Sequence, residues 1–160
     1  MSAEYRPGMT LADLPIPQDA QVTRKWPAQM VEMADHIGPY ATLQLIDHFG
    51  GEQVRVPLDP DRNPFRDVLG PKLAATFSRI YGGNELELPV AKAARDEARR
   101  APVLASVRNK DMTVREAARI LGTARTYVAQ LVNRSREAEN AAPLRRPSRG
   151  DDRQIDLFGT

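Results

Sequence analysis

Two short stretches with the same pattern limit how this chain can fold. Each has two adjacent glycines, a short alternation of polar and apolar residues, and a proline: residues 50–57 are GGEQVRVP and residues 82–89 are GGNELELP. Alternation of this kind is typical of a half-buried β-strand, and the proline ends it because proline cannot donate a ladder hydrogen bond. An isolated ribbon of such length is marginally stable in water. We therefore expect the two strands to pair with each other or with copies in a second subunit.

The segments around the strands have the periodicity of helices. Trp26, Met30, Met33 and Ile37 recur at helical spacing, and the glycine and proline that follow end that helix. Helices are expected over residues 26–37, 39–49, 64–69 and 71–81. With 41% hydrophobic and 6% aromatic residues in 160 positions, neither half can build a large core, and small domains often gain burial by dimerising. Residues 25–88 are predicted to form a helical dimerisation domain that contains the two short strands.

Gly82 and Gly83 stand where the chain is expected to leave this domain. Because glycine adopts backbone conformations that other residues avoid, the pair is predicted to be a hinge in a flexible linker. Residues 1–24 contain several prolines but no periodicity, and we expect a disordered, extended leader there. Residues 137–160 are polar and are predicted to form a disordered tail with an apolar motif at its end.

The positive charge is concentrated in one segment. Residues 89–136 hold 11 Lys and Arg against 4 Asp and Glu, a net charge of +7, whereas residues 1–88 hold 8 against 12, a net charge of −4. Concentrated positive charge is typical of proteins that bind a polyanion such as nucleic acid. A solvated helix surface is the alternative, and charge alone does not separate the two.

Within this basic segment, residues 113–132 have the pattern of a helix-turn-helix. Ala118 is the small residue that two crossing helices need, and Gly122 suits the left-handed backbone of the turn. The core between the helices would be filled by Ala117, Leu121, Val128 and Leu131. Helices are expected over residues 89–100, 102–109, 113–121 and 124–134. The predicted fold is therefore mainly α with short β-strands, and residues 89–136 form a C-terminal helix-turn-helix domain after the linker.

The second of these two helices, residues 124–134, is the candidate recognition helix for the DNA major groove. Arginine pairs bidentately with guanine, glutamine pairs with adenine, and threonine contacts the thymine methyl group. Four cations are better placed for phosphates, which position a protein without specifying sequence: Lys110, Arg115, Arg134 and Arg136. The candidate DNA-binding residues on the helix itself are Arg125, Thr126, Tyr127, Ala129, Gln130, Asn133 and Arg134.

Other classes of function find little support in the sequence. There is no cysteine, and His36 and His48 lack partners at metal-ligand spacing, so we expect neither a metal site nor a cofactor. No nucleophile with a base and no phosphate-binding loop is present, and we expect no enzyme. No apolar run approaches the roughly 20 residues of a membrane span. We expect a cytoplasmic protein, associated with the nucleoid of a bacterial host.

Several motifs in fixed order resemble the Mor transcription activator family of Mu-like phages. The resemblance covers roughly residues 26–134, and its departures are the leader, the tail and Ala124, which replaces the usual polar residue at the start of the recognition helix. The motifs are Trp-Pro-Ala at 26–28, Ile-Gly at 37–38, Asp-His-Phe-Gly-Gly at 47–51, Tyr-Gly-Gly at 81–83 and Leu-Glu-Leu-Pro at 86–89, followed by the helix-turn-helix.

The resemblance implies a homodimer with intertwined N-terminal helices and strands, whose two flexibly linked helix-turn-helix domains bind an inverted repeat in double-stranded DNA. Members of the family activate phage promoters by contacting the alpha and sigma subunits of bacterial RNA polymerase. Gly82 and Gly83 match the linker glycines of the family. Arg55, on the first strand, would lie near the minor groove between the half-sites.

The end of the chain carries a second motif. Residues 154–158, QIDLF, look like the short peptide by which many bacterial proteins bind the DNA polymerase sliding clamp. Leu157 and Phe158 would fill an apolar pocket beside Ile155, and Gln154 would form a hydrogen bond at its edge. An apolar plug on the protein's own surface is the alternative. Two functions thus remain open: a dimeric transcription activator of a phage or prophage, or a replication- or transposition-linked adaptor that holds DNA and recruits the clamp.

Overall fold

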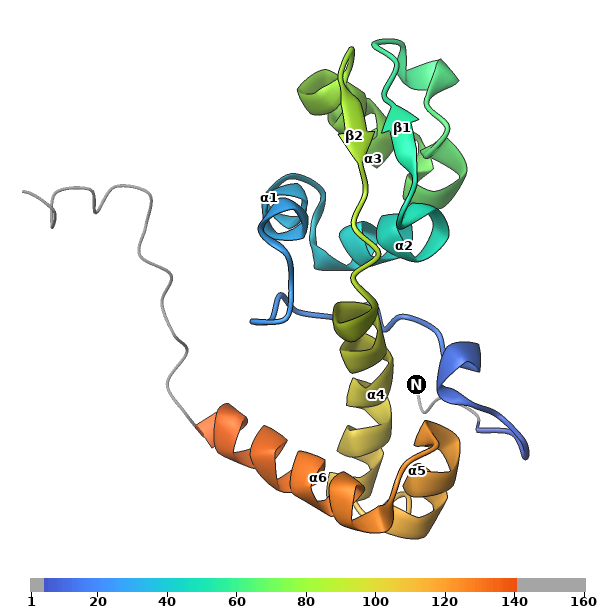
Figure 1. Cartoon of the computed structure of the whole chain (residues 1–160), viewed down its shortest axis with the longest axis vertical. Coiled ribbons are helices and arrows are strands. Elements are labelled where there is room, and N and C mark those ends of the chain that lie inside the picture. The colour runs from blue at the N-terminus through green and yellow to red at the C-terminus, as the bar shows by residue number, and fades with distance from the viewer. Residues whose placement is uncertain (1–4, 141–160) are drawn as a thin grey trace, which may run out of the picture.

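The computed structural model of the protein describes residues 5–140. Two helices, α1 (Ala28–Ile37) and α2 (Pro39–Phe49), meet at a sharp corner and pack against each other (Figure 1). Pro39 opens α2, where its missing N–H has no helical partner to lose. The four apolar residues that define the first predicted helix are all buried, but the helix begins at Ala28, two residues later than predicted, and Trp26 lies before it.

The two predicted strands pair within one chain. β1 (Gln53–Arg55) and β2 (Glu85–Glu87) run antiparallel, with Val54 opposite Leu86. Those two side chains are half-buried and pack on the core, whereas their neighbours along the strands are exposed. The structure therefore has the first of the two predicted arrangements.

Between the strands lie a short 3-10 helix, η2 (Pro60–Arg62), and α3 (Arg66–Tyr81). Gly70 has non-helical angles (φ 80°, ψ 163°) and precedes Pro71, so α3 consists of two helical pieces, as the sequence predicts. Asn63 is buried before α3, and its Nδ2 donates to Ala74 O (3.2 Å) and Ser78 Oγ (2.9 Å). This side chain ties the loop to the helix that follows it.

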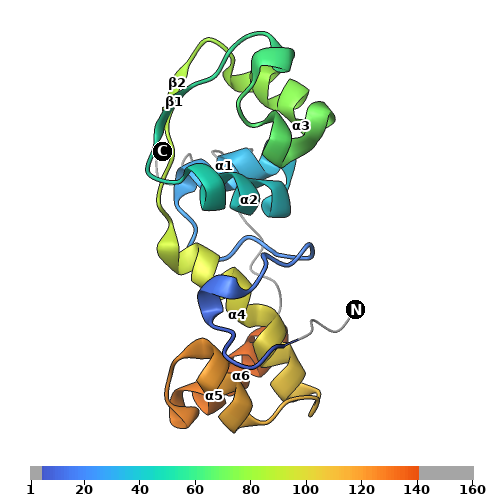
Figure 2. The same cartoon turned by 90° about the vertical axis from the view of Figure 1, so that its right-hand side faces the viewer.

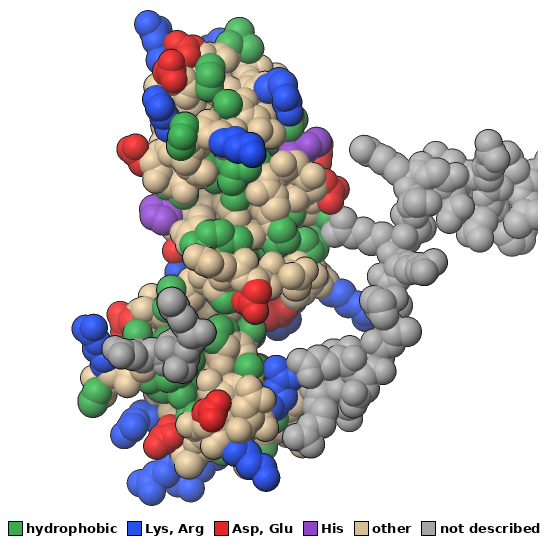
Figure 3. Space-filling model, turned by 180° about the vertical axis from the view of Figure 1, so that it is seen from behind, with side chains coloured by type: hydrophobic (Ala, Val, Ile, Leu, Met, Phe, Trp, Pro, Cys, Tyr) green, Lys and Arg blue, Asp and Glu red, His purple; other side chains and the backbone are tan. Residues whose placement is uncertain are grey.

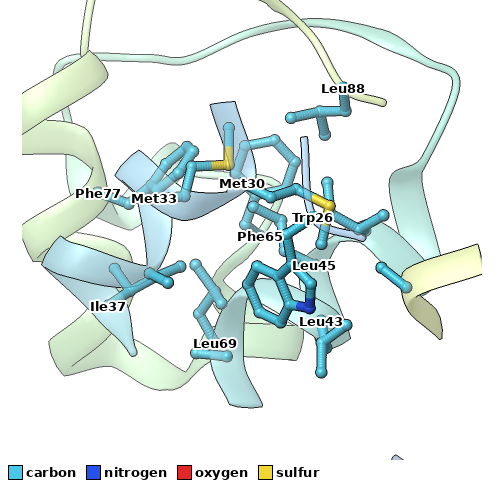
Figure 4. Packing of buried hydrophobic residues seen from close by; sticks show 14 of the residues in the cluster. Trp26, Met30, Met33, Ile37, Leu43, Leu45, Phe65, Leu69, Phe77 and Leu88 are labelled. Carbon is cyan, nitrogen blue, oxygen red and sulfur yellow. The ribbon is translucent and has the colours of Figure 1, made fainter. Parts of the chain in front are cut away.

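We name the first core the N-terminal cluster (Figure 4). Its largest buried members come from α1, α2, α3 and the residues beside the strands. A chain of edge-to-face and tilted ring contacts links Phe49, Phe65, Phe77 and Tyr81, with centroids 4.9, 5.3 and 4.8 Å apart. The cluster comprises Ile16, Trp26, Met30, Met33, Ala34, Ile37, Ala41, Leu43, Leu45, Ile46, Val56, Phe65, Leu69, Phe77, Leu88 and Ala94.

Three helices form the other end of the molecule: α4 (Lys92–Arg108), α5 (Val114–Leu121) and α6 (Arg125–Asn140). Their core, which we name the C-terminal cluster, lies at the opposite end from the strands (Figure 1). None of the helices in the described part of the chain is both long and apolar enough to cross a bilayer. The cluster comprises Leu14, Val103, Leu104, Met112, Ala117, Ala118, Ile120, Leu121, Val128 and Val132.

α4 corrects one prediction. The sequence predicts a break at Pro102, but one helix runs from Lys92 to Arg108. A proline inside a helix costs about 3 kcal/mol. Val103 and Leu104, directly after it, are both buried, and each such burial contributes about 1.5–3 kcal/mol. Burial of this turn of the helix therefore offsets the penalty.

The leader is a second correction. Its residues 5–24 contain turns and one short 3-10 helix rather than a continuous extended chain, and parts of the segment are buried. Leu14 is buried in the C-terminal cluster and Ile16 in the N-terminal cluster. A 3-10 helix, η1 (Leu11–Asp13), packs against α4. The hydrophobic side chains of this segment bury themselves in cores built by distant residues, which no local pattern reveals.

The predicted hinge glycines lie inside the N-terminal half. Gly82 N donates to Ser78 O and Gly83 N donates to Val56 O, both at 2.8 Å, so the pair forms the turn from α3 into β2. β2 and Leu88 after it still pack on the N-terminal cluster. The glycines therefore shape a tight turn, and the chain leaves the cluster only beyond them, through α4.

Asp47 of α2 joins the two halves of the structure. Its Oδ1 accepts from Arg99 Nη2 at 2.6 Å and from Arg95 Nη1 at 3.3 Å, and both arginines lie on α4. Burial alone would raise the pKa of Asp47, but the hydrogen bonds and charges of the two arginines outweigh it and hold that pKa below its usual value.

We expect this link to weaken in acid. Because the folded pKa of Asp47 lies below the unfolded one, its contribution to stability is complete above about pH 4 and is lost as the pH falls through the folded pKa. Urea unfolding of the wild type and of Asp47→Asn should therefore differ clearly at neutral pH and converge in acid. Asp61→Asn, which removes an exposed ion pair with Arg66, serves as the control with a small effect throughout. A difference that stays constant with pH would contradict the prediction.

We also expect Gly82 to tolerate substitution less well than Gly83. A Cβ on Gly82 would lie 2.2 Å from Ser78 O and 3.0 Å from Leu58 Cδ2, whereas one on Gly83 would meet only Leu58 Cδ2, at 3.9 Å. Gly83→Ala should cost about 1–2 kcal/mol, because φ there is +84°. Gly82→Ala should lower the free energy of unfolding by more than that, and equal losses in urea unfolding would refute the steric argument.

Candidate nucleic-acid interface

The geometry of α5, the turn and the start of α6 matches the pattern that the sequence predicts, but α6 continues to Asn140, beyond its predicted end at residue 134 and into the predicted tail. Thr113 Oγ1 accepts from Glu116 N (3.2 Å) and Glu116 Oε2 accepts from Thr113 N (3.1 Å), a capping box that begins α5. Gly122 has left-handed angles (φ 63°, ψ 37°). Its N–H bonds to Arg119 O, and Thr123 N bonds to Ala118 O at 3.0 Å, the hydrogen bonds of a Schellman motif.

The predicted core residues of this segment are where the sequence places them. Ala117 and Val128 are fully buried, and Ala118 and Leu121 are nearly so. Leu131 is half-buried against the same cluster. Val103 and Leu104 of α4 close the core from the other side, so α6 packs against α4 and α5 through its apolar face.

The opposite face of α6 is uncovered. At about 100° per residue, Thr126, Gln130 and Asn133 lie opposite the buried Val128 and Val132, and all three are exposed. Arg125 and Ala129 lie on one flank of that face, and Tyr127 and Arg134 on the other. Every candidate residue of the predicted recognition helix is therefore exposed, and Tyr127 is 39% exposed.

The cations of the basic segment fall into two groups. Arg95, Arg99 and Lys92 form ion pairs with Asp47 or Asp96. In contrast, Arg115, Arg125 and Arg134 are exposed and have no ion-pair partner among the described residues. Seen from behind, Lys and Arg side chains stand around the end of the molecule that carries α5 and α6 (Figure 3). The second group is the one free to meet phosphates.

Further cations beside α6 were not predicted as site residues. A hollow on the α4 side of Tyr127 is lined by Lys25, Lys92 and Arg100. Lys25 pairs with Glu97 at 3.0 Å, whereas Arg100 has no ion-pair partner in the described part of the chain. Sequence reasoning missed them because only the fold brings Lys25, before α1, and the start of α4 next to the start of α6.

The remaining predicted site residues lie elsewhere. Arg55 is exposed on β1, opposite Glu85 in the ribbon, and β1 lies at the other end of the molecule from α6 (Figure 1). One chain therefore does not bring Arg55 together with the α6 residues. Gln154, Ile155, Leu157 and Phe158 lie outside the described residues. Among those that are described, no three His, Cys, Asp or Glu side chains are grouped to hold a metal ion.

Comparisons with protein-family models, curated proteins and solved structures found no match. The site is therefore interpreted from its own geometry and from the motifs in the sequence.

Proposed function

We propose that this protein is a sequence-specific DNA-binding transcription activator of the Mor type, in which α5, the turn and α6 act as a helix-turn-helix. The observation that carries the proposal is the face of α6. Thr126, Gln130 and Asn133 project together from a helix whose other side is fixed in a core. Side chains of this kind read base edges, and unpaired arginines flank them, as a phosphate-binding rim would require.

In this proposal α6 lies in the major groove. Gln130 and Asn133 present amides that can pair with adenine, Thr126 presents a methyl group for thymine, and Arg125 reaches a guanine from the flank. Arg134 and Arg115 bind phosphates on either side, Tyr127 contacts the backbone beside Arg100, and the N–H groups at the start of α6 favour a phosphate there. The homodimer, the inverted repeat and the recruitment of bacterial RNA polymerase follow from the resemblance of residues 26–134 to the Mor family.

The first test is to bind purified full-length protein to fragmented genomic and prophage DNA and to sequence what is retained. An enriched inverted repeat upstream of a promoter is the expected outcome, and it would define the operator. Uniform retention without a motif would overturn sequence-specific binding.

Two substitutions then distinguish contacts with bases, which specify sequence, from contacts with phosphates, which only position the protein. Gln130→Ala should reduce the preference for operator over random DNA by about 1–3 kcal/mol, because it removes a base contact. Arg134→Ala should weaken binding to both and reduce the dependence of log affinity on log salt concentration by about one, because it removes a phosphate contact. Arg79→Ala, exposed on α3 near the other end of the molecule, is the control and should change neither. Equal losses for all three variants would refute the assignment of α6.

The terminal QIDLF sequence favours a second function, a replication- or transposition-linked adaptor that recruits the sliding clamp. Deletion of residues 151–160 separates the two. If the protein is the activator, promoter activation in a reporter strain should survive the deletion. Loss of binding to purified clamp, together with loss of a replication phenotype and intact DNA binding, would instead support the adaptor.

A further inference from the structure

The leader contributes to both hydrophobic clusters from adjacent positions. Leu14 is 4% exposed in the C-terminal cluster, and Ile16 is 5% exposed in the N-terminal cluster. Pro15, which is exposed, stands between them. Figure 2 shows this segment crossing α4 between the two ends of the molecule. Three consecutive residues thus connect two cores whose other buried members lie within residues 26–94 and 103–132.

Hydrogen bonds also hold the leader at Leu14. Arg99 Nε donates to Leu14 O at 2.9 Å, and Arg99 Nη2 donates to Asp47 Oδ1 at 2.6 Å. One guanidinium group of α4 therefore holds the leader and α2 at once. Just before this point, Thr10 N and Oγ1 donate to Asp13 Oδ2 at 2.9 and 2.8 Å, which caps η1, and η1 packs against α4.

The leader also completes the core of the DNA-binding end. Tyr5, Met9 and Leu11 are half-buried against the C-terminal cluster. Ile120, on α5, lines hollows that leader residues 5–12 also line, and is only 6% exposed. A three-helix unit of this size has little core of its own. Without the leader, this side of α5 would face water.

We propose that residues 5–16 form a strap that fixes the orientation of α4–α6 relative to the N-terminal half and so sets the spacing between half-sites that the protein accepts. This rests on the proposed function. The strap is not a cover for the interface, because Thr126, Gln130 and Asn133 of α6 remain exposed with the strap in place. It replaces the flexible linkage that the resemblance implies with a rigid one.

The orientation is measured directly by distances between two spin labels. The chain has no cysteine, so Lys72→Cys on α3 and Asn109→Cys at the end of α4, both exposed, give two unique sites. Labelled chains are diluted with unlabelled protein so that only distances within one chain contribute. The strap variant is Leu14→Ala with Ile16→Ala, and Gln18→Ala, exposed in the same leader, is the matched control.

We expect one narrow distance distribution for the wild type and the control, and a broad one for the strap variant. Arg99→Lys is the second variant, for use if the double variant fails to fold. It keeps a positive charge near Asp47 but loses the separate Nε donor that binds Leu14 O. It should also broaden the distance distribution. Narrow distributions in every folded variant would overturn the strap.

The effect of the strap on half-site spacing is tested with the inverted repeat that the DNA-retention experiment identifies. Inserting about five base pairs, half a helical turn, between the half-sites should weaken wild-type binding by about tenfold or more and strap-variant binding by much less. Equal sensitivity in both would overturn the claim that the strap sets spacing. If the wild type retains no specific DNA but its distance distribution is narrow and depends on the strap, the proposed function fails while the strap stands.

Discussion

Both hydrophobic clusters are built on one helix. α4 contributes Ala94 to the N-terminal cluster and Val103 and Leu104 to the C-terminal cluster, so the chain passes from one core to the other along a single helix. Its 17 residues span about 25 Å at about 1.5 Å per residue. The other connections between the two ends act on this helix: Asp47 through ion pairs from α2, and Leu14 through packing from the leader.

The features that the sequence predicts correctly are those decided over a few neighbouring residues. Helical spacing locates α1, the two pieces of α3 and the buried faces of α5 and α6, because each requires only that apolar residues recur on one side. Gly122 is recognisable since the turn after α5 needs a left-handed residue at one position. The exposed face of α6 then follows from the same period, and with it most of the candidate site.

The features that the sequence does not predict depend on residues far apart in the chain. Pro102 looks like a helix end, and only the burial of Val103 and Leu104 keeps α4 continuous. Gly82 looks like a hinge, but the close approach of Ser78 O and Leu58 explains it as a packed turn. Leu14 and Ile16 stand among prolines without periodicity, and their burial is set by two cores assembled from the rest of the chain.

The net charge of +7 is likewise only a partial guide to the interface. Arg95 and Arg99 are largely buried structural groups that neutralise Asp47, so they contribute to the count but not to a surface for phosphates. Arg115, Arg125 and Arg134 are among the exposed cations, and the fold adds Arg100 beside Tyr127. The sequence therefore predicts that the partner is negatively charged. The position of the contacts depends on which arginines are already paired within the fold.

A rigid connection has two opposite effects on DNA binding under the proposed function. It reduces the conformational entropy that association must remove, which strengthens binding to a site of matching geometry. It also removes the freedom that would let the recognition helices adjust to other spacings. Leu14, Arg99 and Asp47 connect α4 to the leader and to α2, and none of them lies on the exposed face of α6. Specificity for spacing would then depend on packing residues remote from the bases, while specificity for sequence would depend on the exposed face of α6.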